Sequence, residues 1–94
     1  MATAINPMID DLTEYIDNSL FSEGQPHIRG RRITIYWIIA HARENNWGIA
    51  RLAQEFSLNE TQVLAAILYY QLHHEEVDAQ ESALEEKYRH YGEN

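Results

Sequence analysis

The hydrophobic periodicity between Thr34 and His74 constrains the fold of this chain more than any other feature. Apolar residues recur there at spacings of three and four, which is one face of an α-helix, and short polar breaks interrupt the pattern twice. The three apolar faces are Ile35, Ile38, Ile39 and Ala42, then Ile49, Leu52, Ala53 and Phe56, and then Val63, Ala66, Ile67 and Tyr70. The pattern predicts three helices that share one core.

Polar residues at the breaks predict where these helices begin and end. Thr34 is the expected N-cap of the first helix, which should end at Asn45-Asn46 because asparagine tolerates the left-handed conformation. Gly48 begins a shorter second helix, and Asn59 with Gln62 three residues on forms a capping-box pattern before the third. Two helices joined by a tight turn and braced by a preceding helix predict a helix-turn-helix, homeodomain-like core.

The segment before these helices carries weak β signals. The alternation around residues 13–16 predicts a short strand. Gly30 can adopt a positive φ between Ile28 and Ile33. We therefore expect a tight β-hairpin or β-arc with Gly30 at its turn and both isoleucines facing the core.

The chain divides into three parts in this interpretation. Residues 1–12 have no clean period and are expected to be a mobile N-terminal arm. Residues 13–74 form the core domain with its N-terminal β element. Residues 75–94 form an acidic, amphipathic C-terminal helix, so the predicted fold class is mainly α.

Composition excludes several classes of protein. The chain has 94 residues and no cysteine, which excludes a disulfide framework, a thiolate zinc site and a cysteine nucleophile. No apolar run approaches the roughly 18 residues that cross a bilayer, and the N-terminus lacks the features of a signal peptide. A cytoplasmic protein is expected. A homodimer is also expected, because a core of this size is marginal.

The charge of the chain is distributed unevenly. Residues 1–23 carry a net −5, residues 24–71 carry +2 and residues 72–94 carry −5, for a total of −8. Two acidic arms thus flank a mildly basic centre. The arms either keep a small protein soluble or contact a basic partner.

Catalytic and metal-binding patterns are weak. The run His73-His74-Glu75-Glu76 resembles a metal cluster in composition, but adjacent helical residues do not converge on one ion. No nucleophile-elbow, P-loop or dinucleotide-binding string occurs. We expect no catalytic residues, no metal and no cofactor.

Nucleic-acid binding has two sets of candidate residues. The start of the third helix would present Asn59, Thr61 and Gln62 to DNA bases, although this helix has no arginine or lysine. Arg29, Arg31 and Arg32 could clamp phosphates. Alternatively, one arginine bonds the carbonyls at a helix C-terminus or pairs with a carboxylate of an acidic arm.

The C-terminal helix is a candidate for binding another protein. Leu84, Tyr88 and Tyr91 lie at helical spacing and could occupy a groove of a partner. Tyrosine is favoured at interfaces because its rigid ring provides a large contact area. The same residues could instead pack on the chain's own core or on a second copy.

Three separated blocks of the chain resemble a known bacterial family. The stretch Gly24-Gln25-Pro26-His27-Ile28-Arg29-Gly30-Arg31-Arg32-Ile33 is similar to the signature G-x-P-x-I-x-G-T-R-I of the domain-of-unknown-function four-three-three family. Residues 52–58 and 65–70 are similar to its next two blocks, and residues 74–78 to its closing stretch. The signature positions carried over are Gly24, Pro26, Ile28, Gly30, Arg32 and Ile33. Arg31 departs from the usual threonine.

The resemblance implies an antitoxin-like, non-catalytic protein. Members of this family resemble small helix-turn-helix proteins that are often encoded beside a PIN-like toxin nuclease. The implied partners are therefore that toxin and operator DNA. The alternative is a homo-oligomeric protein-interaction module that binds no nucleic acid, which the acidic balance favours.

Overall fold

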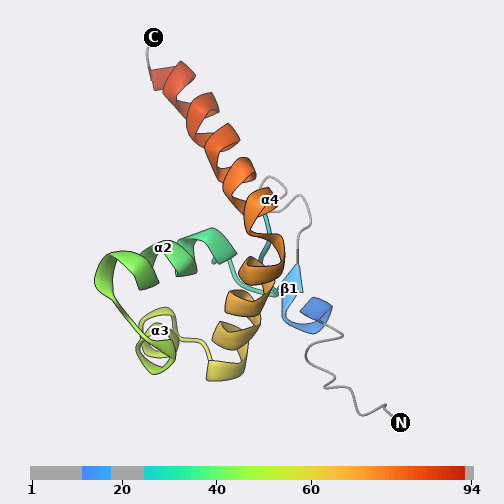
Figure 1. Ribbon diagram of the computed structural model, residues 1–94, viewed down its shortest axis with the longest axis vertical. Helices are drawn as coiled ribbons and strands as arrows, with labels where there is room; N and C mark the ends of the chain where they lie inside the picture. The colour runs from blue at the N-terminus through green and yellow to red at the C-terminus, as the bar shows by residue number, and fades with distance from the viewer. Residues whose placement is uncertain (1–11, 18–24, 93–94) are drawn as a thin grey trace.

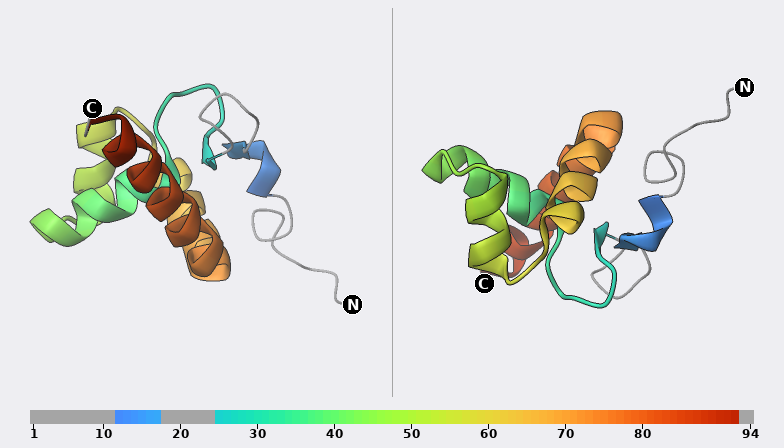
Figure 2. Two further views of the ribbon diagram at one scale, coloured as in Figure 1. Left: turned by 90° about the horizontal axis from the view of Figure 1, so that it is seen from above. Right: turned by 90° about the horizontal axis from the view of Figure 1, so that it is seen from below.

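A long helix, α4, forms the axis of the molecule. The computed structural model describes residues 12–17 and 25–92, with the side chains of residues 13 and 90–92 left aside. In chain order the elements are the 3-10 helix η1 (Leu12–Glu14), the strands β1 (Ile16–Asp17) and β2 (His27–Ile28), and the helices α2 (Ile35–Asn45), α3 (Ile49–Phe56) and α4 (Glu60–Gly92). Figures 1 and 2 show α2 and α3 on one side of α4, and η1 and β1 on the other. The described chain is mainly helical, as the sequence predicts.

The two short strands form an antiparallel pair. Ile16 lies opposite Ile28, and Asp17 lies opposite His27. The predicted strand at residues 13–16 is wrong in its position, because η1 occupies its first residues and β1 begins only at Ile16. The amide of Tyr15 donates to the carbonyl of Leu12 at 2.9 Å. This turn brings Leu12 and Tyr15 side by side against the core, since residues three apart eclipse in a 3-10 helix.

The turn after β2 is centred on Gly30, as predicted. Gly30 has a φ of 83°, and the amide of Arg31 donates to the carbonyl of Ile28 at 3.0 Å. A second bond runs from the amide of Ile28 to the carbonyl of Ile33 at 2.9 Å. Ile28 is fully buried and Ile33 packs against the core from a half-buried position. The turn therefore returns the chain to the start of α2.

Side-chain and backbone caps define the helix ends at the predicted residues. The Oγ1 of Thr34 accepts a bond from the amide of Trp37 at 3.1 Å, so Thr34 caps α2. Asn46 ends that helix in the left-handed conformation, with φ 57°. Gly48 is the N-cap of α3, and Ser57 ends it with the same φ of 57°. These caps confirm the predicted boundaries of the first two helices.

A reciprocal capping box begins α4. The amide of Gln62 donates to Oδ1 of Asn59 at 2.8 Å, and the amide of Asn59 donates to Oε1 of Gln62 at 2.9 Å. Two amides that lack intrahelical partners are satisfied in this way. The predicted capping pattern is confirmed.

One core joins the strands to all three described α-helices. Its fully buried side chains include Ile28, Ile35, Ile38, Leu52 and Val63. Val77 is 2% exposed and belongs to the same cluster. Because Val77 lies in α4 well past the end of α3, the long helix contributes to the core along more than half of its described length.

The element α4, 33 residues long, consists of two helices that meet at a kink, which agrees with the predicted third helix and the separate C-terminal helix after it. His73 has φ −134° and ψ 30°, outside the helical region. The residues after this kink, 74–92, are called the arm. The arm leaves the rest of the molecule and contributes to its longest dimension of 58 Å, against 26 and 22 Å for the other two (Figure 1). No helix in the described residues is long and apolar enough to cross a membrane.

Candidate partner-binding arm and arginine turn

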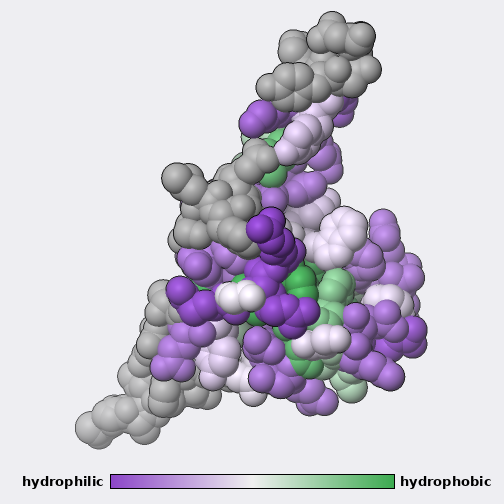
Figure 3. Space-filling view, turned by 180° about the vertical axis from the view of Figure 1, so that it is seen from behind, coloured by the Kyte–Doolittle hydropathy of each residue, from purple (hydrophilic) through white to green (hydrophobic). Residues whose placement is uncertain are grey.

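The net negative charge of the arm lies in its first part, because residues 75–81 carry four acids and no base, whereas residues 82–92 carry two of each. Residues 74–92 contain six acidic and two basic residues, a net charge of −4 with histidine neutral. Residues 85–89 are all exposed. Figure 3 shows hydrophilic side chains over much of the described part of the arm, whereas hydrophobic residues gather over the globular part on this face. The negative charge is therefore concentrated in the part of the arm nearest the core, and the exposed end carries both signs, with Glu86 paired to Arg89 at 3.0 Å.

Two residues outside the arm, Tyr70 and Gln25, donate hydrogen bonds to its first half. The hydroxyl of Tyr70 donates to both carboxylate oxygens of Asp78, each at 3.0 Å. The Nε2 of Gln25, just before β2, donates to Oε1 of Glu81 at 2.7 Å. The direction of the arm is therefore set by contacts on both sides of the kink.

Carboxylates of the arm act on Tyr36 near the start of α2. Burial raises the pKa of Tyr36 above its usual value, and the negative charges of Glu81, Glu85 and Asp78 raise it further. Burial is the larger cause, and the carboxylates add negative charge near the Tyr36 hydroxyl. A cationic group of a partner would be stabilised there.

The three predicted partner-binding residues differ in their environment. Leu84 is half-buried, so part of its surface is covered by its own chain. Tyr88 is 54% exposed and lies near the end of the arm. The side chain of Tyr91 lies outside the described residues. Among the described side chains of this set, Tyr88 is therefore more accessible to a partner than Leu84.

Two arginines of the predicted phosphate-binding turn make contacts within the chain. Arg31 donates from its two terminal nitrogens to the carbonyls of Ser57 at 3.0 Å and Phe56 at 3.1 Å. Arg29 lies 3.6 Å from the carboxylate of Asp17 and donates to the carbonyl of Ile16 at 3.3 Å. Both alternatives to a phosphate clamp are therefore present: Arg31 bonds carbonyls at the C-terminal end of α3, and Arg29 pairs with a carboxylate.

The remaining signature positions surround the same turn. Pro26 and Ile28 are buried, and Arg32 is exposed on the turn. Gly24 lies outside the described residues. The signature therefore corresponds to a structural turn that delivers the chain from β2 to α2.

The predicted base-reading residues lie at the start of α4. Asn59 and Thr61 are exposed there, and Gln62 is half-buried. Asn59 and Gln62 use their amide oxygens in the capping box. Bidentate contact with adenine needs both the oxygen and the nitrogen of an amide, so Gln62 would have to share its oxygen or leave the cap.

His27 is the one buried polar residue among those described in this part of the fold. It is 2% exposed, and its Nδ1 donates to the carbonyl of Gln25 at 3.0 Å, since a carbonyl can only accept. Its Nε2 lies 3.9 Å from the carboxylate of Asp17. A pocket of about 290 Å³ is lined by Asp17, His27, Gly30 and Arg31.

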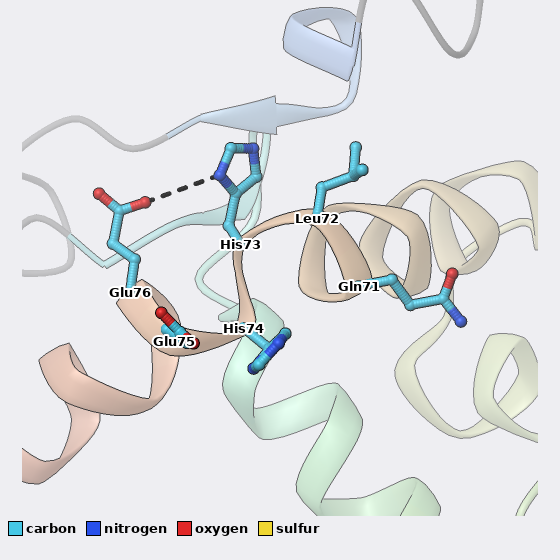
Figure 4. Close-up of a pocket in the computed structure, with 6 residues that line it drawn as sticks. All are labelled: Gln71, Leu72, His73, His74, Glu75 and Glu76. Carbon is cyan, nitrogen blue, oxygen red and sulfur yellow. Dashed lines mark ion pairs between the residues drawn. The ribbon is translucent and has the colours of Figure 1, made fainter.

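The histidines and glutamates at the kink do not converge. Figure 4 shows His73 and Glu76 facing each other, at 3.8 Å, whereas His74 points to another side, toward α2. The pocket at this kink measures about 280 Å³. Within the described part of the chain, no group of three or more such residues has a metal-binding arrangement.

Sequence analysis missed an aromatic cluster that joins α2 to α3. The ring of His41 lies 4.5 Å from Trp37, 6.3 Å from Trp47 and 5.6 Å from Phe56. Arg51 stacks over Trp47 at 4.7 Å. We call these five residues the aromatic–arginine face. The spacing of Trp37 and His41, four residues apart on one helix, is the only sequence signal for it.

Comparison with known proteins identifies a family for the core. A family model described as "Protein of unknown function (DUF433)" matches residues 18–70. Neither the comparison with curated proteins nor the comparison with solved structures found a match. The matched stretch ends at Tyr70, so the arm lies outside it. Because the match covers more than half of the sequence, the chain belongs to the DUF433 family.

Proposed function

We propose that this chain is a non-catalytic, antitoxin-like protein that uses its arm to bind and block a basic surface of a PIN-like toxin nuclease. The observation that supports this proposal is the arm itself, which carries a net charge of −4 that comes from residues 75–81, where Glu75, Glu76 and Asp78 are exposed. Nucleases bind phosphate backbones through basic surfaces, and an acidic helix is complementary to such a surface. We expect the protein to act in the cytoplasm as a homodimer.

The carboxylates of the arm near Tyr36 support the same proposal. Glu81, Glu85 and Asp78 all act on Tyr36. A lysine or arginine of the partner that approaches this part of the arm would be attracted by the same carboxylates. Charge pairs of this kind speed association and give specificity.

The test is co-expression with a PIN-like nuclease from the same gene neighbourhood. The double variant Glu75→Gln/Glu76→Gln should lose neutralisation of the nuclease and bind it at least about tenfold more weakly, since it removes two charges from the acidic part of the arm. The matched control is Glu85→Gln/Glu86→Gln, which removes the same charge from the exposed end. Equal neutralisation by both variants would argue against the assignment of the arm's acidic part.

Operator DNA is a second candidate partner. The observation that favours it is the succession of α3, a tight turn and α4, with Thr61 exposed at the start of α4, which is typical of a helix-turn-helix. The internal bonds of Arg29 and Arg31 and the lack of arginine or lysine in residues 60–72 favour instead an interaction module that binds no nucleic acid.

Salt dependence separates these two candidates. If phosphate contacts form, the affinity for promoter DNA falls steeply between low and moderate salt. Arg32→Ala should then weaken binding and reduce the salt slope by about one. Binding that is absent at low salt would leave the interaction module as the better interpretation.

A further inference from the structure

The kink at His73 has no cause in the local sequence. Figure 4 shows the two parts of α4 meeting at this residue. Sharp kinks in helices usually occur at proline, at glycine–serine pairs or at bulges, but residues 62–81 contain no proline, glycine or serine. Leu72 and Glu75, on either side of the kink, are strong helix formers. By local preference alone, α4 would therefore continue as one straight helix.

Contacts between the arm and the globular part require the bend instead. Val77 is 2% exposed in the core, and Gln25 donates to Glu81 at 2.7 Å. The hydroxyl of Tyr70 donates to the carboxylate of Asp78 at 3.0 Å. In a straight helix these two residues stand about 12 Å apart, since each residue rises about 1.5 Å, so one chain makes this contact only when it bends. Local preference and the packing of the arm thus favour different shapes of α4.

Two copies of the chain can satisfy both preferences at once. If α4 straightens at His73 in each copy, the arm of one copy reaches the globular part of the other. Val77, Asp78 and Glu81 then make the contacts that they make in the monomer, because every copy presents the same receiving residues. Exchange of an identical element between protomers is a low-cost route to a dimer for this reason.

The residues next to the hinge suit a meeting of two copies, because both hinges lie close together where exchanged arms cross. Leu72, just before the hinge, is 58% exposed, so contact with a second copy would remove apolar surface from water. Residues 61–74 contain no aspartate, glutamate, lysine or arginine, the longest such run in a chain whose net charge is −8. Repulsion between like charges therefore does not oppose contact at this place, whereas it does on the acidic parts of the chain.

We propose that two copies of this chain form a dimer by exchanging their arms, with His73 as the hinge and a straight α4 in each copy. The surface that binds the arm of the second copy is the one that holds the chain's own arm in the monomer, and it includes Tyr70 and Gln25. This inference specifies the homodimer and goes beyond the binding of a nuclease. Its test contains no nuclease and no DNA, so its failure leaves the nuclease proposal to its own experiment.

Cross-linking identifies the copy to which an arm binds, because the chain has no cysteine of its own. One protein carries Gln25→Cys in the globular part, and a second, tagged protein carries Glu81→Cys in the arm. The two full-length proteins are unfolded together in urea, refolded at high concentration and treated with a short bismaleimide. Exchanged arms bring the two thiols within reach, because Gln25 and Glu81 are in contact. A cross-linked pair with the mass of one tagged and one untagged chain should appear on a denaturing gel.

A matched mixture controls for links that form by random collision. It combines Gln25→Cys with a tagged Glu60→Cys, because Glu60 is exposed at the far end of α4 from the arm. This mixture should give less than a tenth of the mixed pair. Equal yields from the two mixtures, or dimers whose arms stay linked to their own chains in the double variant Gln25→Cys/Glu81→Cys, would overturn the exchange. A wild-type chain that stays monomeric at its highest soluble concentration would overturn it as well.

His73→Ala and His73→Gly test the hinge as a matched pair. Both remove a side chain that is 45% exposed, together with its pairing to Glu76 and its contact with Tyr69. Alanine is favoured over glycine in a helix by a factor of about five, and an exchanged dimer contains two straightened hinges. The dimerisation constant of His73→Ala, measured by sedimentation, should therefore exceed that of His73→Gly by about 30-fold. Equal constants or the reverse order, in variants that circular dichroism shows to be folded, would overturn the assignment of the hinge.

Discussion

The guanidinium group of Arg31 joins the turn at Gly30 to the C-terminal end of α3. It donates to the carbonyls of Phe56 and Ser57, and carbonyls at a helix C-terminus lack intrahelical partners. The planar group can serve two carbonyls at once, which an ammonium group cannot do with the same geometry. The threonine that the family signature usually carries at this position is too short to make this connection. Arg31 therefore contributes a contact between turn and helix that is a property of this chain.

Replacement of Arg31 by lysine should lower the free energy of unfolding by about 1 kcal/mol, because the charge remains but the pair of hydrogen bonds is lost. Urea unfolding followed by circular dichroism measures this change. The control Arg51→Lys retains the pairing with Glu55 four residues on and should stay within about 0.5 kcal/mol of the wild type. Equal effects of the two substitutions would show that the contact with α3 adds nothing to stability.

Tyr36 should make stability fall at alkaline pH. Burial and the carboxylates of the arm raise its pKa above 10.0 in the folded state, so the folded chain holds this proton more tightly than the unfolded chain. The stabilisation is complete below the unfolded pKa and is lost as pH rises through the folded pKa. The unfolded pKa of tyrosine is ~10. Between pH 9 and pH 11 the free energy of unfolding should therefore decrease less in Tyr36→Phe than in the wild type. Urea unfolding at several pH values measures this difference. Parallel decreases in the two proteins would contradict this origin.

At the scale of the element, the kink at His73 is what makes α4 both a core helix and an arm. Eight residues of straight helix rise about 12 Å, and the hydroxyl of Tyr70 nevertheless reaches the carboxylate of Asp78, eight residues on. Val77 enters the core between them. The first residues of the arm are thus part of the globular unit, and its continuously exposed stretch begins only after Leu84.

Removal of the Tyr70 hydroxyl should loosen the arm. Tyr70→Phe loses hydrogen bonds to a carboxylate, so the free energy of unfolding should fall by about 1–2 kcal/mol. Amide hydrogen exchange should accelerate in residues 78–84 more than in α3. A double-mutant cycle with Asp78→Asn isolates the pair. A coupling energy of zero would show that this contact does not hold the kink.

At the scale of the whole molecule, the basic and the acidic residues lie in different parts of the fold. The arginines are concentrated between the turn and α3, and acidic residues dominate the arm that extends away from them. The core depends on the start of the arm but not on its end. Binding surfaces at the end of the arm can therefore change without a cost to the fold.

Two truncations should separate folding from binding. A chain that ends after Leu84 lacks residues 85–89, which are exposed. Its free energy of unfolding should lie within about 1 kcal/mol of that of the full protein, since surface changes have small effects. A chain that ends after His74 loses the buried Val77 and the contacts of Asp78 and Glu81, and should lose at least about 3 kcal/mol. Urea unfolding of both chains measures the difference. Similar stability of the two truncated proteins would place the whole arm outside the folded unit.

The sequence by itself determined the local structure of this protein. Caps at Thr34, Asn46 and the Asn59–Gln62 pair, and the turn at Gly30, were predictable because each depends on conformations and hydrogen bonds within a few residues. The periodicity likewise predicted which helix faces are buried. The signature also identified the family that matches residues 18–70.

Only the tertiary structure decided which of these residues can meet a partner. Three neighbouring arginines predict a phosphate clamp, yet Arg31 bonds α3 and Arg29 pairs with Asp17 across the strands. The aromatic–arginine face and the tie between Tyr70 and Asp78 likewise depend on how helices lie against each other. The physical reason is that such contacts join residues that are distant in the chain, or on two sides of a bend, and their geometry is set by packing of the core rather than by local preference.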